Sequence, residues 1–580
     1  RPSLVAVRAS ERPRIDGALD EAAWAQAHVI DAFIQQEPQE GQPATDRTEV
    51  RVLYDAGHLY IGVRAFSSLA VTATEMRRDA DRLFDEDNFQ VILDTFHDSR
   101  NGYMFVTTPL GAKLEQQIFD EGEGGGRGGT ANINRNWDGV WDAAAKIVED
   151  GWTAEIEIPF STVRFVPRDD QVWGVNFQRH IRRKNESVLW APIPKAYTLT
   201  RVSLAGEMRG LQQISRGLDL RLKPFLVGGL RNLQLSPAAK STDAIKDIGL
   251  DARYGLTSGL NMDVTINTDF AQVEVDEQQV NLTRFGLFYP EKRDFFLEGL
   301  GTFAFAGRAS AGLAAGTGDT PYLFFSRRIG LDQSRVIPIR AGGRVTGKAR
   351  NVTFGALNVQ TGDDDAARIE EANFTVLRAK ADVLRRSSIG GMLTHRTATP
   401  GRIGSNDGFG VDTALSFYQN VRLDAYLAAT RTEGREGNNL SYRGFFDYNA
   451  DKVGVQAERL VVEPNFLPEI GFVRRTDMRR NFALARYSPR PRTIPNLRRL
   501  TGQASLAYIT NNRDRLDTRD ATARFEAEFT NSDVFSVSFT DNFERLVRPF
   551  AIAPGVNIPV GAYDFHTTRI GYVAGQQRPY

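Results

Sequence analysis

Long, strictly alternating runs in the last two-thirds of the chain constrain its fold most. In residues 521–530, Ala and Phe alternate with Thr, Arg and Glu, and residues 260–267 and 422–430 follow the same rule. Runs of about 9–11 residues suit tilted membrane-spanning strands, whereas strands of globular proteins average about 5–6 residues. The pattern predicts a transmembrane β-barrel of about sixteen strands. A water-soluble sandwich, with the polar face in solvent, is the alternative.

The connections between these runs favour the barrel. Short polar turns at 419–420, 449–451 and 531–533 alternate with longer polar loops at 397–407 and 430–439. Outer-membrane barrels have short turns at one end and long loops at the other. No apolar run approaches the ~18 residues of a membrane helix. We therefore expect an antiparallel barrel in the bacterial outer membrane, with lipid as the partner of its outer face.

The first 205 residues have a different sequence pattern. Residues 48–54, 59–65, 88–94 and 152–158 are short runs rich in β-branched and aromatic residues, and turn residues separate them. This spacing is typical of a β-sandwich. The whole chain is thus predicted to be all-β. The expected division is a β-sandwich over 1–205, a connector over 206–217 and the barrel over 218–580.

Composition removes several classes of function. Lys plus Arg and Asp plus Glu both number 72, so the chain has no net charge, and nucleic acid is not an expected partner. The absence of cysteine excludes disulfides, thiolate metal sites and cysteine nucleophiles. The six histidines are scattered, without the spacing of metal ligands. The glycine-rich run 342–348 imitates a phosphate-binding loop, but it lies in an alternating run without a following helix.

The two ends of the chain carry expectations of their own. The sequence begins at Arg1 without Met or an apolar signal segment, so we interpret it as a mature or trimmed chain. Residues 575–580 do not form an alternating apolar strand. Barrel closure is then expected to use another strand, unless the chain is cut short.

Tryptophans in the first part are candidates for glycan binding. Trp137 and Trp141 flank a loop, and Trp190 ends a strand. An aromatic ring can stack on the apolar face of a sugar while nearby polar groups, here Asn176 and Arg179, bind its hydroxyls. Packing at the edge of the core is the alternative for each ring. The other three tryptophans, Trp24, Trp152 and Trp173, are expected in the core.

Several of these runs together resemble a known family. Residues 15–24 (IDGALDEAAW), 89–96 (FQVILDTF) and 151–160 (GWTAEIEIPF) resemble the family 9 carbohydrate-binding modules, and the resemblance covers about residues 8–200. It implies a β-sandwich that binds glycan ends, often with structural calcium. Trp190 is the best positional match to one of the family's sugar-stacking rings. The other would fall near Phe84, where this chain has no tryptophan.

The second part resembles a family of bacterial outer-membrane proteins of unassigned function that carry such a module before a barrel. The motifs are 269–276 (DFAQVEVD), 288–298 (FYPEKRDFFLE) and 464–475 (PNFLPEIGFVRR). Aromatic residues are dense in 285–296, so we expect that cluster to pack inside or against the barrel wall. Its neighbouring acids, Glu274, Asp276 and Glu277, would line the lumen or bind a cation.

Three functions remain open. The leading hypothesis is a non-enzymatic outer-membrane protein whose sandwich binds or presents oligosaccharide or polysaccharide, linked to carbohydrate uptake. The first alternative is a membrane-anchored O-glycosyl hydrolase, which would need two carboxylates, and acidic pairs such as Glu155 and Glu157 are too common to single one out. The second alternative is structural, with the sandwich as a docking domain for a partner protein.

Overall fold

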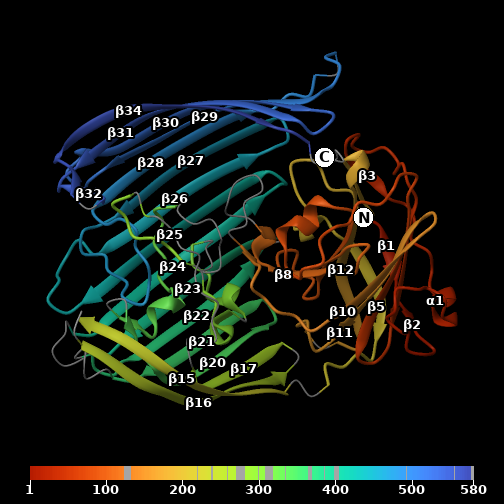
Figure 1. Ribbon diagram of the computed structural model, residues 1–580, viewed down its shortest axis with the longest axis horizontal. Coiled ribbons are helices and arrows are strands. Elements are labelled where there is room, and N and C mark those ends of the chain that lie inside the picture. The colour runs from red at the N-terminus through yellow and green to blue at the C-terminus, as the bar shows by residue number, and fades with distance from the viewer. Residues whose placement is uncertain are drawn as a thin grey trace.

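The computed structural model divides the chain into a β-sandwich and a large curved sheet (Figure 1). It describes residues 1–122, 132–166, 168–217, 220–236, 239–257, 259–268, 281, 283–289, 291–297, 299–306, 318–332, 335–363, 369–384, 386–397, 404–491, 493–553 and 555–575. Within these ranges, no helix has the length and apolar character needed to cross a membrane. The prediction of an all-β chain is confirmed.

The sandwich consists of two sheets. The larger has nine strands in the order β1-β14-β12-β6-β7-β8-β9, with β13 beside β12 and β3 beside β13, and the smaller has the order β10-β11-β5-β4-β2. Its elements are β1 (Ser3–Val5), β2 (Val7–Arg8), α1 (Ala22–Gln26), β3 (Ile34–Glu37), β4 (Thr48–Tyr54), β5 (His58–Phe66), β6 (Asn88–Asp94), β7 (Gly102–Thr107), β8 (Lys113–Ile118), β9 (Ile133–Asn134), β10 (Asp142–Val148), β11 (Gly151–Pro159), β12 (Asp170–Ile181), β13 (Glu186–Leu189) and β14 (Gly206–Gln212).

Apolar side chains from the facing sheets form the sandwich core. Trp152 of β11 and Trp173 of β12 are fully buried there, and Trp24 of α1 packs in a smaller cluster with Leu53 and Tyr60. All three tryptophans lie in the core, as predicted. Full burial of side chains this large contributes several kcal/mol each (about 1.5–3 for an ordinary apolar side chain).

The sandwich extends beyond its predicted end at residue 205. Strand β14 pairs antiparallel with β12 and parallel with β1, so 206–212 of the predicted connector belongs to the larger sheet. The physical reason is that Met208 and Leu211 are buried in the sandwich core, which a solvent-exposed connector would not allow. The link to the barrel begins only after Gln212.

The curved sheet has sixteen strands, each antiparallel to its neighbours in chain order. Its strands are β15 (Leu220–Ser236), β16 (Ala239–Thr257), β17 (Leu260–Thr268), β20 (Ile339–Ala349), β21 (Val352–Thr361), β22 (Asn373–Val383), β23 (Ser387–Arg396), β24 (Asn406–Phe417), β25 (Val421–Thr432), β26 (Leu440–Asn449), β27 (Val453–Val462), β28 (Met478–Tyr487), β29 (Leu497–Thr510), β30 (Leu516–Phe529), β31 (Val534–Leu546) and β34 (Gly561–Val573). The predicted number and type of strands are confirmed.

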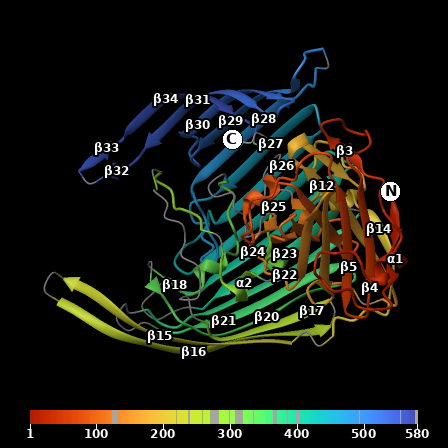
Figure 2. The ribbon, with the colours of Figure 1, turned by 45° about the vertical axis from the view of Figure 1, so that its right-hand side comes forward.

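The two faces of this sheet differ as an outer-membrane barrel requires. Leu377 and Leu393 are 45% and 48% exposed on the outer face, whereas Arg378 and Thr394, next to them in sequence, are buried on the inner face. Phe525 and Phe539 are also outward and exposed. In the described part of the chain, β15 and β34 are the two edges of the sheet and do not pair with each other (Figure 2).

A long insertion between β17 and β20 fills part of the space inside the sheet. It contains α2 (Asp294–Leu297), β18 (Leu331–Asp332) and β19 (Arg335–Val336), which lie within its curve (Figure 2). The insertion is called the plug below. Phe295, Phe296 and Phe303 of the plug share one buried cluster with inward residues of the strands. This packing was predicted, whereas Glu274, Asp276 and Glu277 lie outside the described residues.

Candidate functional site

The aromatic residues predicted to stack on sugars are buried in the sandwich. Only 6% of Trp190 and 5% of Trp137 and Trp141 is exposed. Trp190 packs on Phe177 with 5.7 Å between ring centroids, and a Cβ at Gly206 would lie 2.5 Å from its ring. No ring face is therefore open to a sugar, and the structure favours the alternative of core packing.

The polar groups of the indoles and their neighbours have partners inside the domain. The Trp141 Nε1–H donates to a Glu115 carboxylate oxygen at 2.9 Å. The Asn176 side-chain amide donates to the carbonyl of Ala191 at 2.8 Å and its oxygen accepts from the Ala191 N–H at 2.8 Å. Buried polar groups need such partners, so these contacts stabilise the fold.

Arg179 and Phe84 are not placed for a sugar either. The Arg179 guanidinium is buried and donates to the carbonyls of Arg47 and Phe66 at 3.1 and 2.6 Å. Phe84 is half-buried against a separate cluster at the other face of the larger sheet. The six predicted residues are thus not brought together as one site, and sugar binding by them stays a prediction without structural support.

The structure instead draws attention to the surface by which the sandwich meets the barrel. Tyr197 donates from its hydroxyl to the carbonyl oxygens of Gln419 at 2.8 Å and Asn449 at 3.2 Å. Gln419 lies in the β24–β25 turn, and Asn449 is the last residue of β26 before the β26–β27 turn. Farther along the rim, Arg498 at the start of β29 donates to the carbonyl of Asn185, and Asn185 bonds Ser532 in the β30–β31 turn. The sandwich therefore contacts one short turn after another around this end of the barrel.

A network of buried charges forms the central part of this junction. Arg100 of the sandwich pairs with its own Asp120 and with Asp382 of β22 at 2.7 Å, and only 4% of its side chain is exposed. Lys348 of β20 lies 2.6 Å from both Asp382 and Asp98. Cations and carboxylates from both parts thus alternate, which keeps each buried charge compensated.

Glu121 extends the network along the rim. Its carboxylate pairs with Arg386 in the β22–β23 turn and lies 3.5 Å from Arg201 of the sandwich. Asp120 and Glu121 both have positive φ angles, 44° and 61°. Non-glycine residues adopt this conformation at a cost of about 1–3 kcal/mol. The ion pairs with the barrel offset that cost, because the strained turn directs both carboxylates toward the barrel cations.

The loop after β6 positions Asp98 and Arg100. The Asp94 carboxylate accepts from the N–H groups of Asp98 and Ser99 at 3.1 and 2.7 Å, and Asp98 in turn accepts from the N–H groups of Arg100 and Asn101. His97 and Ser99 have φ angles of 52° and 58°. These bonds turn the loop sharply, so that Asp98 and Arg100 both reach the barrel.

Burial and the neighbouring charges shift the pKa values of these sandwich carboxyls in opposite directions. Burial alone would raise the pKa of Asp120, but Arg100 and Lys380 hold it well below its ordinary value. Lys348 lowers the pKa of Asp98 against the same effect of burial. Asp94 has its pKa raised well above the ordinary range by burial and by the nearby Asp98 charge. The two groups that contact barrel cations are therefore the ionised ones.

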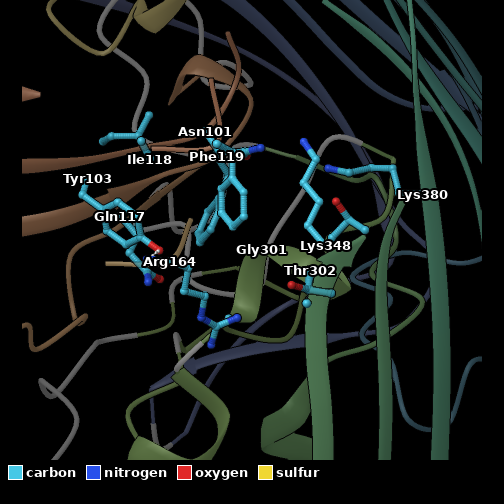
Figure 3. A pocket seen from close by; sticks show the side chains of 15 residues that line it. Asn101, Tyr103, Gln117, Ile118, Phe119, Arg164, Gly301, Thr302, Lys348 and Lys380 are labelled. Atoms are coloured by element: carbon cyan, nitrogen blue, oxygen red, sulfur yellow. Dashed lines mark hydrogen bonds between the residues drawn. The ribbon is translucent and has the colours of Figure 1, made fainter. Parts of the chain in front are cut away.

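A cavity of about 80 Å³ lies beside this network, between the sandwich, the plug and the wall (Figure 3). Phe119 points into it from the sandwich, Lys348 and Lys380 reach it from the wall, and Thr302 lines it from the plug. A Cβ at Gly301 would lie 2.2 Å from the Phe119 ring, so only glycine allows this close approach. A cavity of this size holds a few water molecules, and it is too small for a sugar ring.

Metal binding finds no support in the described ranges, where His, Asp and Glu side chains form no cluster of three or more suited to a metal ion. The structural calcium that the resemblance implies stays a prediction. Sequence reasoning missed the junction altogether. The available signal was Asp120-Glu121-Gly122, two acids and a glycine beside the glycine-rich loop, but nothing in it identifies the partner cations.

Comparison with known proteins identifies the sandwich. Residues 15–187 match the family model described as carbohydrate family 9 binding domain-like. The sandwich is a family 9-like carbohydrate-binding domain. Residues 217–353, which span the first barrel strands and the plug, match a domain of unknown function, DUF5916. No curated protein matches the chain.

Solved structures resemble each part of the chain. A family 9 carbohydrate-binding module from Caldicellulosiruptor kristjanssonii in complex with glucose is 14% identical, with a TM-score of 0.25, and the match covers 36% of this chain and 95% of that one. A BenF-like porin from Pseudomonas fluorescens Pf-5 is 8% identical, with a TM-score of 0.27 and coverage of 84% and 97%. OccK7 from Pseudomonas aeruginosa is 9% identical, with a TM-score of 0.24 and coverage of 79% and 91%.

Proposed function

We propose that this protein is a non-enzymatic outer-membrane barrel for glycan uptake, in which the family 9-like domain caps one end of the lumen. The observation that carries the proposal is the series of contacts between the domain and successive short turns, from Lys348 at β20–β21 to Ser532 at β30–β31. A domain that contacts the turns around a barrel end, and the plug inside it, is placed to control passage through the lumen.

The same contacts support a periplasmic position for the cap. Outer-membrane barrels have their short turns in the periplasm and their long loops outside the cell. The turns that the sandwich contacts are short, such as 384–386 and 418–420, whereas the opposite end carries connections such as 463–477 and 547–560. The cap then lies in the periplasm, where it meets glycan that has entered from outside.

A glycan role for the sandwich is supported by its family match alone. Glu155, one of the acids considered for a hydrolase, has structural partners in the sandwich. Glu155 accepts from the Trp24 indole N–H at 2.9 Å and from the backbone N–H of Gly17 at 2.8 Å. Since these bonds occupy a buried carboxylate, we propose no catalytic role for it.

Ion conductance of the full chain in planar lipid bilayers tests the proposal. With the cap in place we expect small, infrequent openings. Arg100→Ala removes the central cation of the junction and should increase the open probability several-fold. Lys146→Ala is the matched control, because Lys146 pairs with Asp16 at 3.1 Å on the exposed surface of β10. Equal conductance of all three proteins would contradict a capping role.

A further inference from the structure

A large cavity with candidate ligand groups lies inside the barrel, toward the long loops. Its volume is about 600 Å³, and its walls come from the plug, the 463–477 loop, strands β28 to β31, the β32 (Phe550–Ala553) and β33 (Val556–Ile558) hairpin, and β34. Ligand pockets usually measure about 300–1,000 Å³. This cavity is therefore large enough for one or two sugar rings, in contrast to the small cavity at the junction.

One wall of the cavity is built from arginines around a plug aromatic ring. The guanidinium carbons of Arg475 and Arg284 lie 4.1 and 4.8 Å from the Phe285 ring centroid. Arg284 also pairs with Glu544 and Asp517 at 3.0 Å each, and Arg475 donates to the Thr518 hydroxyl at 3.0 Å. The stacked, paired guanidinium groups hold fixed positions, as a preorganised binding wall requires.

Two polar groups of this wall have unused hydrogen-bonding capacity. Arg475 Nε is buried and has no hydrogen-bond partner among the described residues. Only 9% of the Arg475 side chain is exposed. Asp520 also lines the cavity, and within the described ranges its carboxylate forms no ion pair or hydrogen bond. The Asp520 carboxylate is a bidentate acceptor on the cavity wall, and such a group binds neighbouring sugar hydroxyls.

Strand β34 supplies an aromatic surface to the cavity. Phe565 of β34 lines the cavity with 48% of its surface exposed, and Tyr563 lies beside it with its hydroxyl bonded to the carbonyl of Pro559 at 2.7 Å. A phenyl ring with an open face can stack on the apolar face of a pyranose. The buried tryptophans of the sandwich offer no such face.

The charges of the cavity indicate a neutral ligand. Its lining arginines are balanced by carboxylates, with Arg284 paired to Glu544 and Arg480 lying 3.9 Å from Asp319. Four arginines and three carboxylates line the cavity, and Asp517, which pairs with Arg284 and Arg475 behind the wall, supplies a fourth carboxylate. The guanidinium charges are therefore matched, and no excess is left to favour an acidic sugar. We propose that this cavity binds one or two rings of a neutral saccharide, with Phe565 as the stacking ring and Asp520 as the hydroxyl ligand. The inference rests on the proposed glycan function and places the binding site in the barrel.

Titration calorimetry of the full chain in detergent tests the site, with cellotriose and maltotriose as neutral probes and a trigalacturonate as the acidic probe. We expect a neutral probe to bind and Phe565→Ala to weaken it about tenfold. Asp520→Asn should weaken it severalfold. Phe539→Ala is the matched control, because Phe539 is 46% exposed on the outer face and stacks on His566 there.

Each outcome decides the inference separately from the capping role. Tighter binding of the trigalacturonate, no binding of either neutral probe at millimolar concentration, or equal affinities of Phe565→Ala and wild type would overturn it. The proposed cap fails by another measurement, the conductance of Arg100→Ala. If Phe565→Ala loses the saccharide while its heat-induced unfolding matches that of Phe539→Ala, the loss is one of binding and not of folding.

Discussion

The junction between cap and barrel can be tested by removing its central cation. In Arg100→Ala the buried carboxylate of Asp120 and the partly buried carboxylate of Asp382 lose a shared partner. Removing one member of a buried ion pair costs about 3–5 kcal/mol. Lys380 stays 3.7 Å from Asp120, and Lys348 stays 2.6 Å from Asp382, so part of the compensation remains. We therefore expect the free energy of docking to weaken by about 3 kcal/mol, near the lower limit of that range. This corresponds to a shift of the docking equilibrium of roughly 100-fold.

Intrinsic fluorescence measures this loss without labels. All six tryptophans lie between residues 24 and 190, so the tryptophan signal of the intact chain follows the sandwich alone. Denaturant titration in detergent should show a less stable sandwich in Arg100→Ala. The Lys146→Ala control should change stability by less than about 1 kcal/mol, as exposed ion pairs do.

A substitution on the barrel side separates docking from an effect inside the sandwich. Asp382→Asn leaves every sandwich residue intact, but it removes the partner that Arg100 and Lys348 share across the junction. If docking stabilises the sandwich, the fluorescence transition should shift in this variant too. A shift in Arg100→Ala without any shift in Asp382→Asn would refute the reasoning, because the network would then act within the sandwich only.

Three further outcomes follow from the same structure. Docking should weaken as the pH falls below about 4, because the sandwich carboxylates that face barrel cations have depressed pKa values. Their contribution to stability is complete above the pKa of the unfolded chain and is lost as they protonate. The stability of the sandwich, followed by fluorescence as a function of pH, measures this. Phe525→Arg should impair barrel assembly by about 2–4 kcal/mol, whereas Thr522→Arg, on the lumen face of the same strand, should be tolerated; heat-modifiable gel mobility measures assembly. Trp190→Ala should destabilise the sandwich by about 3–5 kcal/mol as a core truncation; the same fluorescence titration measures it, and a change in sugar affinity with unaltered stability would contradict core packing.

The barrel was predictable because its signal is local. Alternation along one strand reports which face each side chain occupies, and the runs around Phe525 and Leu260 carry that information without reference to any other segment. The predicted bounds of the sandwich strands 48–54 and 88–94 match those of the structure for a similar reason, because turn residues precede and follow each strand. Periodicity and turn residues are enough to predict the bounds and the faces of a strand when its neighbours in the sheet are unknown.

The candidate site was not predictable, because its residues are far apart in the sequence. Arg100 and Asp382 are 282 positions apart, and each alone is an ordinary charged residue near a turn. The tryptophans misled for a related reason. An indole beside polar residues has the same local sequence whether it faces solvent or, like Trp141, donates to a buried carboxylate such as Glu115. Only the opposing sheet distinguishes the two cases.

The chemistry of the junction bears on whether the cap can move. An apolar interface would hold the sandwich on the barrel at any ionic strength and pH, because hydrophobic burial depends weakly on both. Here the contacts are ion pairs such as Lys348 with Asp98 and hydrogen bonds such as Tyr197 with Gln419, and a cavity with room for water lies beside them. Water can take over each of these bonds when the surfaces separate. A junction of this kind fits a cap that opens and closes better than it fits a permanent seal.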